Sequence, residues 1–313
     1  MPVPHLWPSA AGLAVPRSFA AGYGDGVERG LSLGGGGLFF VAWQVAYLHT
    51  LATYGVRFDD ADRVVGTSAG SVVASTLLAG RLKRLHAEVS LLAKVPALLS
   101  VLAPASELGP SQQRALDLFS AAGDAEPVTV QGIGHAALAA VTPGPSSIRR
   151  NVSLLVGRSP WYSGALAITC VDAYSGERCV VDRSAGTAVA RAVAASSAVP
   201  GVFPPQPIAD RRCMDGGVSG SGTHLDLLAG AGRALILALT DGSDQTEGMM
   251  TMAPGDSRRE REELRASGCE VVLRTPTEVD IDKLMAPASL PKALAMGAHQ
   301  ASDDVGMLAT FWG

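Results

Sequence analysis

The sequence predicts an α/β fold in which a mainly parallel central sheet is covered by helices. The first indication is that short apolar runs alternate with helical stretches over residues 29–79. The second is that residues 71–79 are apolar on nearly every side, so a helix there must be buried. The third is size, because a chain of 313 residues that is 47% hydrophobic can bury a large core.

The start of the chain can be assigned from local patterns. Residues 1–28 contain four prolines, no basic segment and no continuous apolar run, which predicts an irregular N-terminal arm. The apolar residues 29–33 predict a short buried strand, and the four glycines at 34–37 predict a turn. The apolar stretch 38–55 ends in a glycine, as is typical of a helix.

The middle of the chain continues the alternation. A second strand is expected at 62–66 and a helix at 69–79, followed by several short helices in the alanine-rich, proline-broken residues 81–150. Residues 165–182 alternate around a Tyr-Ser-Gly turn, which predicts a β-hairpin. An alanine-rich helix is expected within residues 186–201, and the proline near the end of this stretch should end the helix.

The last third adds three expected elements. These are a buried strand at 233–240, a charged surface helix at 257–268 and a late strand at 269–276. The sequence contains no internal repeat and no change in composition after the arm. We therefore expect residues 29–313 to form one domain.

Charge and composition exclude several classes of protein. Lys and Arg number 25 against 29 Asp and Glu, so the net charge of −4 provides no global attraction to nucleic acid. No stretch reaches the ~20 apolar residues of a membrane-spanning helix, and we expect a cytoplasmic protein. The four cysteines lack the short spacings of zinc sites, so we expect reduced thiols, no metal and no cofactor. They are Cys170, Cys179, Cys213 and Cys269.

A serine occupies the corner between the second expected strand and its helix. Residues 66–70 read Gly-Thr-Ser-Ala-Gly, a G-x-S-x-G motif whose small neighbours let the backbone turn sharply. The Ser68 hydroxyl would then lie at the helix N-terminus, where free amides and the helix dipole stabilise an oxyanion. The alternative is a serine that only caps the helix.

Two further motifs fit a hydrolytic site. The glycines at 34–37 offer unobstructed amides that can converge on a developing negative charge. A phosphate-binding loop is disfavoured, because the G-x-G-x-x-G pattern fails at Phe39 and no Gly-Lys-Ser/Thr follows. Asp215 lies in the sequence Cys-Met-Asp-Gly-Gly at the end of an expected strand, although an isolated Asp-Gly pair commonly forms only a turn.

The order of these blocks resembles the patatin-like phospholipases, in the form found in actinobacterial proteins. The resemblance runs from about residue 30 to the C-terminus and rests on LSLGGGG, VVGTSAGSVVAS, AVAASSAVPGVFPP and MDGGVSGSGTHLDLLAGAGRALIL. It implies a three-layer α/β/α fold in which Ser68 and Asp215 form a catalytic dyad without histidine. The glycine loop would supply the oxyanion hole through the amides of Gly35, Gly36 and Gly37.

The resemblance also implies an activity. The chain would be a serine hydrolase of lipid esters, a phospholipase A or carboxylester hydrolase of lipid breakdown, with its substrate at a membrane surface. Asp215 can act as a base only if burial raises its pKa well above the usual ~3.9. Residues 38–40, Leu-Phe-Phe, replace a stretch in which many members carry an arginine that could anchor a phosphate. These phenylalanines would line an acyl groove or pack the start of the helix, and the head group stays open.

Two alternatives fit the same residues. One is a Ser-His-Asp triad, which requires a histidine later in the chain than its aspartate. The candidates are His224 and His299 after Asp172, Asp182 or Asp215. The other alternative is a lipid-binding protein of this fold without turnover. Whether the enzyme uses a dyad or a triad, the apolar residues 91–105 are expected to cap the acyl groove or to pack as ordinary core.

Overall fold

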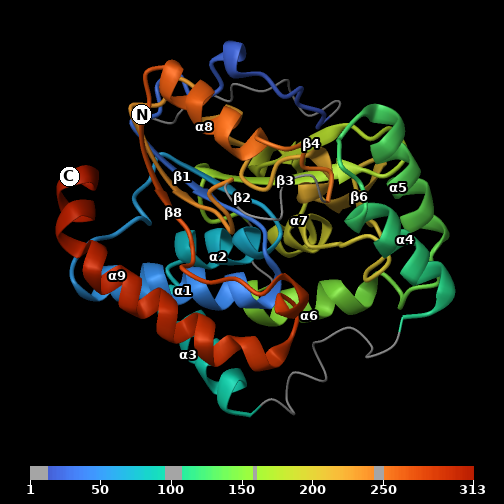
Figure 1. Cartoon of the computed structure of the whole chain (residues 1–313), viewed down its shortest axis with the longest axis horizontal. Coiled ribbons are helices and arrows are strands. Elements are labelled where there is room, and N and C mark those ends of the chain that lie inside the picture. Colours follow the sequence, from blue (N-terminus) through green and yellow to red (C-terminus); the bar gives the residue numbers. More distant parts are fainter. Residues whose placement is uncertain (1–12, 96–107, 158–160, 243–249) are drawn as a thin grey trace.

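The chain folds around one β-sheet that carries helices on both faces (Figure 1). This arrangement is seen in a computed structural model, which describes residues 13–95, 108–157, 161–242 and 250–313. Within these ranges, no helix combines the length and the apolar character needed to cross a bilayer. The expected cap at 91–105 lies mostly outside the described residues.

Over the described residues, the sheet has eight strands, most of them parallel. Their hydrogen-bonded order is β5-β6-β3-β2-β1-β7-β8, and β4 pairs with β3 off this path. Strands β3, β2, β1, β7 and β8 are parallel to one another, whereas β4 and β6 run antiparallel to β3. The strands are β1 (Arg29–Leu33), β2 (Arg63–Gly66), β3 (Leu166–Asp172), β4 (Arg178–Val181), β5 (Gln206–Ile208), β6 (Arg211–Asp215), β7 (Arg233–Leu237) and β8 (Glu270–Arg274).

The helices are distributed unequally over the sheet (Figure 1). One face is covered by α1 (Gly37–Thr53), α2 (Ala69–Leu78), α3 (Leu82–Lys94), α6 (Ser146–Val156), α7 (Val189–Ser196) and α9 (Leu290–Trp312). The other face carries α8 (Asp256–Ala266) and the short 3-10 segment η5 (Leu225–Leu228). Helices α4 (Pro110–Ser120) and α5 (Pro127–Ala139) pack at the β6 end, beside η4 (Gly216–Ser219). The other 3-10 segments of the described residues are η1 (Phe19–Ala21), η3 (Arg183–Ala185), η6 (Ile281–Lys283) and η7 (Pro287–Ser289).

This architecture confirms the predicted class, a three-layer fold with a mainly parallel sheet. Every residue of β2 and β3 is buried, as expected of parallel strands that are covered on both faces. Helix α2 is also buried along its length except at Leu78, which explains why its sequence has no polar face. The predicted hairpin at 165–182 is confirmed as the antiparallel pair β3–β4.

The described part of the N-terminal arm, residues 13–28, is packed against the body of the protein. The Val15 amide donates to the carbonyl of Arg178 at 3.0 Å, next to the outer edge of β4. Val15, Tyr23 and Val27 are buried, and η1 is the one helical turn in this stretch. The described residues of the arm therefore form no long element, and several of their side chains join the core.

Helix α9 was not expected from the sequence, and it lies along α1 (Figure 1). A Cβ on Gly297 would lie 2.4 Å from the carbonyl oxygen of Trp43, so glycine permits the close approach of the two helices. Trp43 donates through Nε1 to Gln300 at 2.8 Å, and the Tyr47 hydroxyl donates to Asp304 at 2.5 Å. These contacts fix the C-terminal helix on the face that also carries α2.

The C-terminal ends of β2 and β6 meet beside β3. Alternate residues of a strand direct their backbone hydrogen bonds to opposite sides. Ala165 bonds toward β2 and Ala173 toward β6, an even number of residues apart, whereas Asp172 bonds toward β4. Strands β2 and β6 therefore share one edge of β3. Because they run in opposite directions, Gly66 at the end of β2 and Asp215 at the end of β6 face each other.

Candidate active site

Ser68 lies at the sharp turn between β2 and α2, with φ 50° and ψ −116°. Residues with a side chain rarely adopt positive φ, and such strain clusters at functional sites. A Cβ on Gly70 would lie 1.9 Å from the carbonyl oxygen of Leu33 at the end of β1. The Gly70 amide instead donates to the carbonyl of Gly34 at 3.1 Å. Small residues thus hold this strained corner against the glycine loop.

The glycine loop touches Ser68 directly. A Cβ built on Gly35 would lie 3.2 Å from the Cβ of Ser68. The Gly35 amide donates to the carbonyl of Gly222 at 3.3 Å, so it is already engaged. Within the described part of the chain, the amides of Gly36 and Gly37 donate to no acceptor. These two amides, at the N-terminus of α1, are available to a ligand.

The stretch Leu-Phe-Phe that follows the loop packs inward. Phe39 and Phe40 are both buried, and Phe40 stacks on Trp43 with ring centroids 5.4 Å apart. Of the two expectations for these phenylalanines, the structure supports packing of the helix start.

Asp215 is buried at the end of β6, with 4% of its surface exposed. Burial raises the pKa of its carboxyl to about 6, while the Gly217 amide and the nearby Ser68 hydroxyl oppose the rise. Its Oδ1 accepts from the Gly217 amide at 2.9 Å. Its Oδ2 is buried and forms no hydrogen bond with any described group. Asp215 therefore keeps one carboxylate oxygen unpaired, and the direction of its pKa shift is the one expected of a base.

Thr169 of β3 lies between the two strand ends. Its hydroxyl is 2.8 Å from the hydroxyl of Thr67, the residue before Ser68. A Cβ on Gly216, the residue after Asp215, would lie 2.6 Å from the same Thr169 oxygen. The chain segments that carry Ser68 and Asp215 therefore meet across one threonine side chain.

The end of α7 links the same two segments, which no sequence argument indicated. The Ser196 hydroxyl accepts from the Ser68 amide at 2.9 Å. Two residues later, the Ala198 carbonyl accepts from the Asp215 amide at 3.0 Å. The only sequence signal was the block AVAASSAVPG, whose paired serines end an alanine-rich helix.

His224 packs in a buried cluster with Arg178 and Asp226, and the backbone of Gly216, the residue after Asp215, also acts on its ring. Arg178 donates to both carboxylate oxygens of Asp226, at 2.6 and 2.7 Å, and lies 3.4 Å from Nδ1 of His224. Burial and the guanidinium lower the pKa of His224 to about 3, so its ring is neutral at pH 7. His224 directly precedes η5 but makes no side-chain cap to it.

The Arg178–Asp226 pair gives a stability prediction. Asp226→Asn should lower the free energy of unfolding by about 3 kcal/mol, because it leaves a buried guanidinium without its counter-charge. Urea unfolding followed by circular dichroism measures the change. The matched control is Asp59→Asn, which removes the partner of exposed Arg57 and should leave stability nearly unchanged. Equal stability of the two variants would contradict the prediction.

The other residues considered for a triad are exposed or have other partners. His299 is exposed on α9, with 80% of its side chain accessible. Asp172 pairs with Arg211 at 3.3 Å, and Asp182 caps η3 through its side chain. Among the described residues, no histidine forms a hydrogen bond with Ser68 or Asp215.

The sequence matches the family model described as patatin-like phospholipase over residues 31–228. The chain belongs to the patatin-like phospholipase family. It is therefore an ester hydrolase of the lipid acyl hydrolase class. The matched region includes the glycine loop, Ser68 and Asp215, whereas β7, α8, β8 and α9 follow it.

Solved structures give weaker likenesses. VipD from Legionella pneumophila is 12% identical with a TM-score of 0.41, over 94% of this chain and 68% of its own. The type III effector ExoU is 15% identical with a TM-score of 0.30, over 88% of this chain and 53% of its own. No curated protein matches the sequence. The place of this patatin-like chain in its family thus stands on the family model.

Proposed function

We propose that this patatin-like hydrolase cleaves lipid carboxylic esters with Ser68 as nucleophile and Asp215 as general base. The proposal is carried by one observation, the meeting of the β2 and β6 ends across Thr169. This meeting sets a strained serine at a helix N-terminus beside a buried carboxylate with one unpaired oxygen. A nucleophile and a base in such proximity are the requirement for acyl transfer.

The reaction follows from these positions. Asp215 accepts the proton of the Ser68 hydroxyl as its oxygen attacks the ester carbonyl, and the alcohol leaves with a proton returned by Asp215. An acyl-enzyme on Ser68 remains. Asp215 then takes a proton from water as the water attacks the acyl carbonyl, and returns that proton to the Ser68 oxygen as the fatty acid is released.

The proposed oxyanion hole uses the amides of the glycine loop. Gly36 and Gly37 present unpaired amides next to the loop residue that touches Ser68, and they belong to the positive end of α1. The amide of Gly35 already donates to the Gly222 carbonyl, so the proposed role of Gly35 is to keep the loop close to Ser68.

Gly35→Ala tests this arrangement. The added methyl would lie 3.2 Å from the Cβ of Ser68, so the loop or the serine must shift. We expect kcat to fall between about 10- and 100-fold while the fold is kept, because small misplacements of reacting groups are costly. Gly306→Ala in α9 is the matched control, since a Cβ there meets nothing within 4 Å. An unchanged rate for Gly35→Ala would contradict the assigned role.

The substrate is proposed to be a lipid ester taken from a membrane surface in the cytoplasm, for lipid breakdown. Support comes from the family and from the exposed apolar side chains Leu91 and Val95 at the end of α3, 55% and 40% accessible. The four cysteines are free thiols, as in a reducing compartment. Buried Phe39 and Phe40 occupy the stretch where a phosphate anchor would stand, so the proposal is made for the ester rather than the head group.

A lipid digest tests the proposed function. A total lipid extract is incubated with the wild-type chain and with Ser68→Ala, and released fatty acids are quantified by mass spectrometry. The proposal expects fatty acids with the wild type and none above background with the variant. Binding of lipid vesicles without any release by the wild type would support the alternative of a lipid-binding protein.

A further inference from the structure

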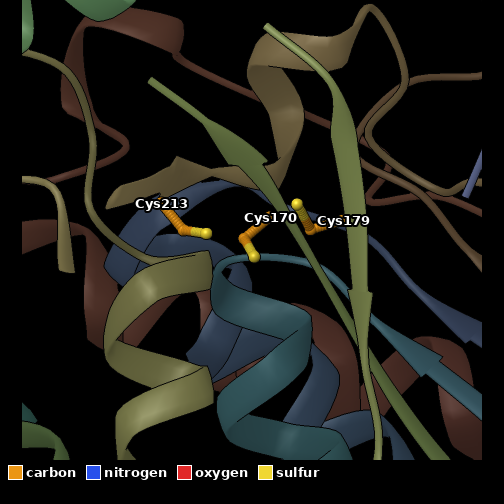
Figure 2. Close-up of side chains that lie close together, drawn as sticks. All are labelled: Cys170, Cys179 and Cys213. Atoms are coloured by element: carbon orange, nitrogen blue, oxygen red, sulfur yellow. The ribbon is translucent and has the colours of Figure 1, made fainter. Parts of the chain in front are cut away.

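Three of the four cysteines gather inside the sheet, although no sequence spacing relates them (Figure 2). The sulfur atoms of Cys170, Cys179 and Cys213 all lie within 4.8 Å of one another, and each residue is fully buried. Cys170 and Cys179 come from the hairpin strands β3 and β4, and Cys213 comes from β6, later in the chain. Figure 2 shows the sulfur of Cys213 directed toward Cys170.

The strand register explains why the thiols meet. Cys170 lies directly opposite Cys179 in the β3–β4 pair, and cross-strand neighbours point to the same face of a sheet. In the β3–β6 pair, Asp172 is opposite Cys213, which places this third thiol diagonally from Cys170 on that face. Because β3 is hydrogen-bonded to both β4 and β6, the backbone holds the three sulfur positions together.

We propose that Cys170, Cys179 and Cys213 bind a monovalent copper ion, Cu(I), through their three sulfurs. Thiolates select soft ions, of which Cu(I) and Zn²⁺ are the usual biological cases. Structural zinc almost always takes four ligands, but no fourth His, Cys, Asp or Glu of the described residues joins this group. A buried set of three thiols therefore favours Cu(I), which accepts three-coordinate sulfur.

The spacing of the sulfurs is compatible with such a site. With metal–sulfur bonds of about 2.3 Å, three sulfurs around one ion lie about 4 Å apart, within the spacing of the cluster. Binding exchanges the three S–H protons for Cu–S bonds and releases the protons, which leaves a negative complex. Arg211, two residues before Cys213 on β6, pairs with Asp172 and Glu177, and its buried Nε has no partner among the described groups.

The test is a titration of the full-length, reduced and metal-free chain with Cu(I) in competition with a coloured Cu(I) chelator. We expect one copper per chain, a sulfur-to-copper charge-transfer band in the ultraviolet, and three sulfur neighbours by X-ray absorption. Cys170→Ser, Cys179→Ser and Cys213→Ser should each lose the band. Cys269→Ser is the matched control, because this fourth buried cysteine lies before β8 and outside the cluster.

Circular dichroism and thermal unfolding accompany each titration. Copper should raise the melting temperature of the wild type and of Cys269→Ser but not of the three cluster variants. If one serine variant does not fold, the corresponding alanine variant and the other two positions carry the same comparison. Failure of the wild type to retain copper against the chelator would overturn the site, and so would loss of binding in Cys269→Ser. Preferential binding of Zn²⁺ with a fourth ligand would also overturn it.

Discussion

Replacing Ser68 by alanine is expected to lower kcat/KM for a short soluble ester by at least about 10⁴-fold. The reason is that the hydroxyl is the proposed nucleophile, so the acyl-enzyme on residue 68 cannot form without it. The variant should fold, because alanine is smaller than serine and Ser68 makes no side-chain cap to α2. The measurement is a steady-state assay with a chromogenic ester, together with circular dichroism of both proteins.

The same helix offers a matched control for this loss. Ser75→Ala removes a buried hydroxyl that bonds only within α2, to the carbonyl of Ser71 at 2.7 Å. Its kcat/KM should stay within a few-fold of the wild type. A Ser68→Ala protein that keeps most of its activity would contradict the assignment of the nucleophile.

Asp215→Asn is the second change with a large expected effect. The amide keeps the shape of the carboxylate and can still accept from the Gly217 amide, but it cannot take a proton from Ser68. We expect kcat to fall by about 10²- to 10⁴-fold, the usual contribution of a general base, with the fold retained. The loss should appear for soluble esters and lipid esters alike, because the base acts on the bond and not on the head group.

Two further variants separate the dyad from a histidine triad. Asp172→Asn makes the same chemical change at a carboxylate that pairs with Arg211, and it should leave the rate of the folded protein nearly unchanged. His299→Ala removes an exposed ring on α9 and should also be silent. An active Asp215→Asn combined with an inactive His299→Ala would replace the dyad by a triad.

Much of the fold can be predicted from local sequence patterns. The strands β1, β2, β7 and β8 are short apolar runs bounded by turns, and α2 is apolar all round, so periodicity alone indicates a covered parallel sheet. Helix α9 could not be assigned in this way. Its register is set by tertiary contacts such as the fit of Gly297 against Trp43, and no local period reports such contacts.

The candidate site was only partly predictable. Ser68 lies in a G-x-S-x-G motif, which predicts a sharp strand-to-helix turn, and the loop is recognisable by its four consecutive glycines. Asp215 lies near Ser68 because β6 pairs antiparallel with β3, on the same edge of β3 as β2. This pairing joins residues that are far apart in the chain. The roles of Ser196 and Ala198 were missed for the same reason, since a helix end contacts both segments only after the sheet has formed.

The most direct test of the Ser68–Asp215 assignment is covalent labelling by a fluorophosphonate, followed by mass spectrometry of the digested protein. The account predicts a single adduct on the peptide that contains Ser68, its absence in Ser68→Ala, and much slower labelling in Asp215→Asn with His299→Ala labelled like the wild type. An adduct on another serine, or labelling of Asp215→Asn at the wild-type rate, would contradict the account.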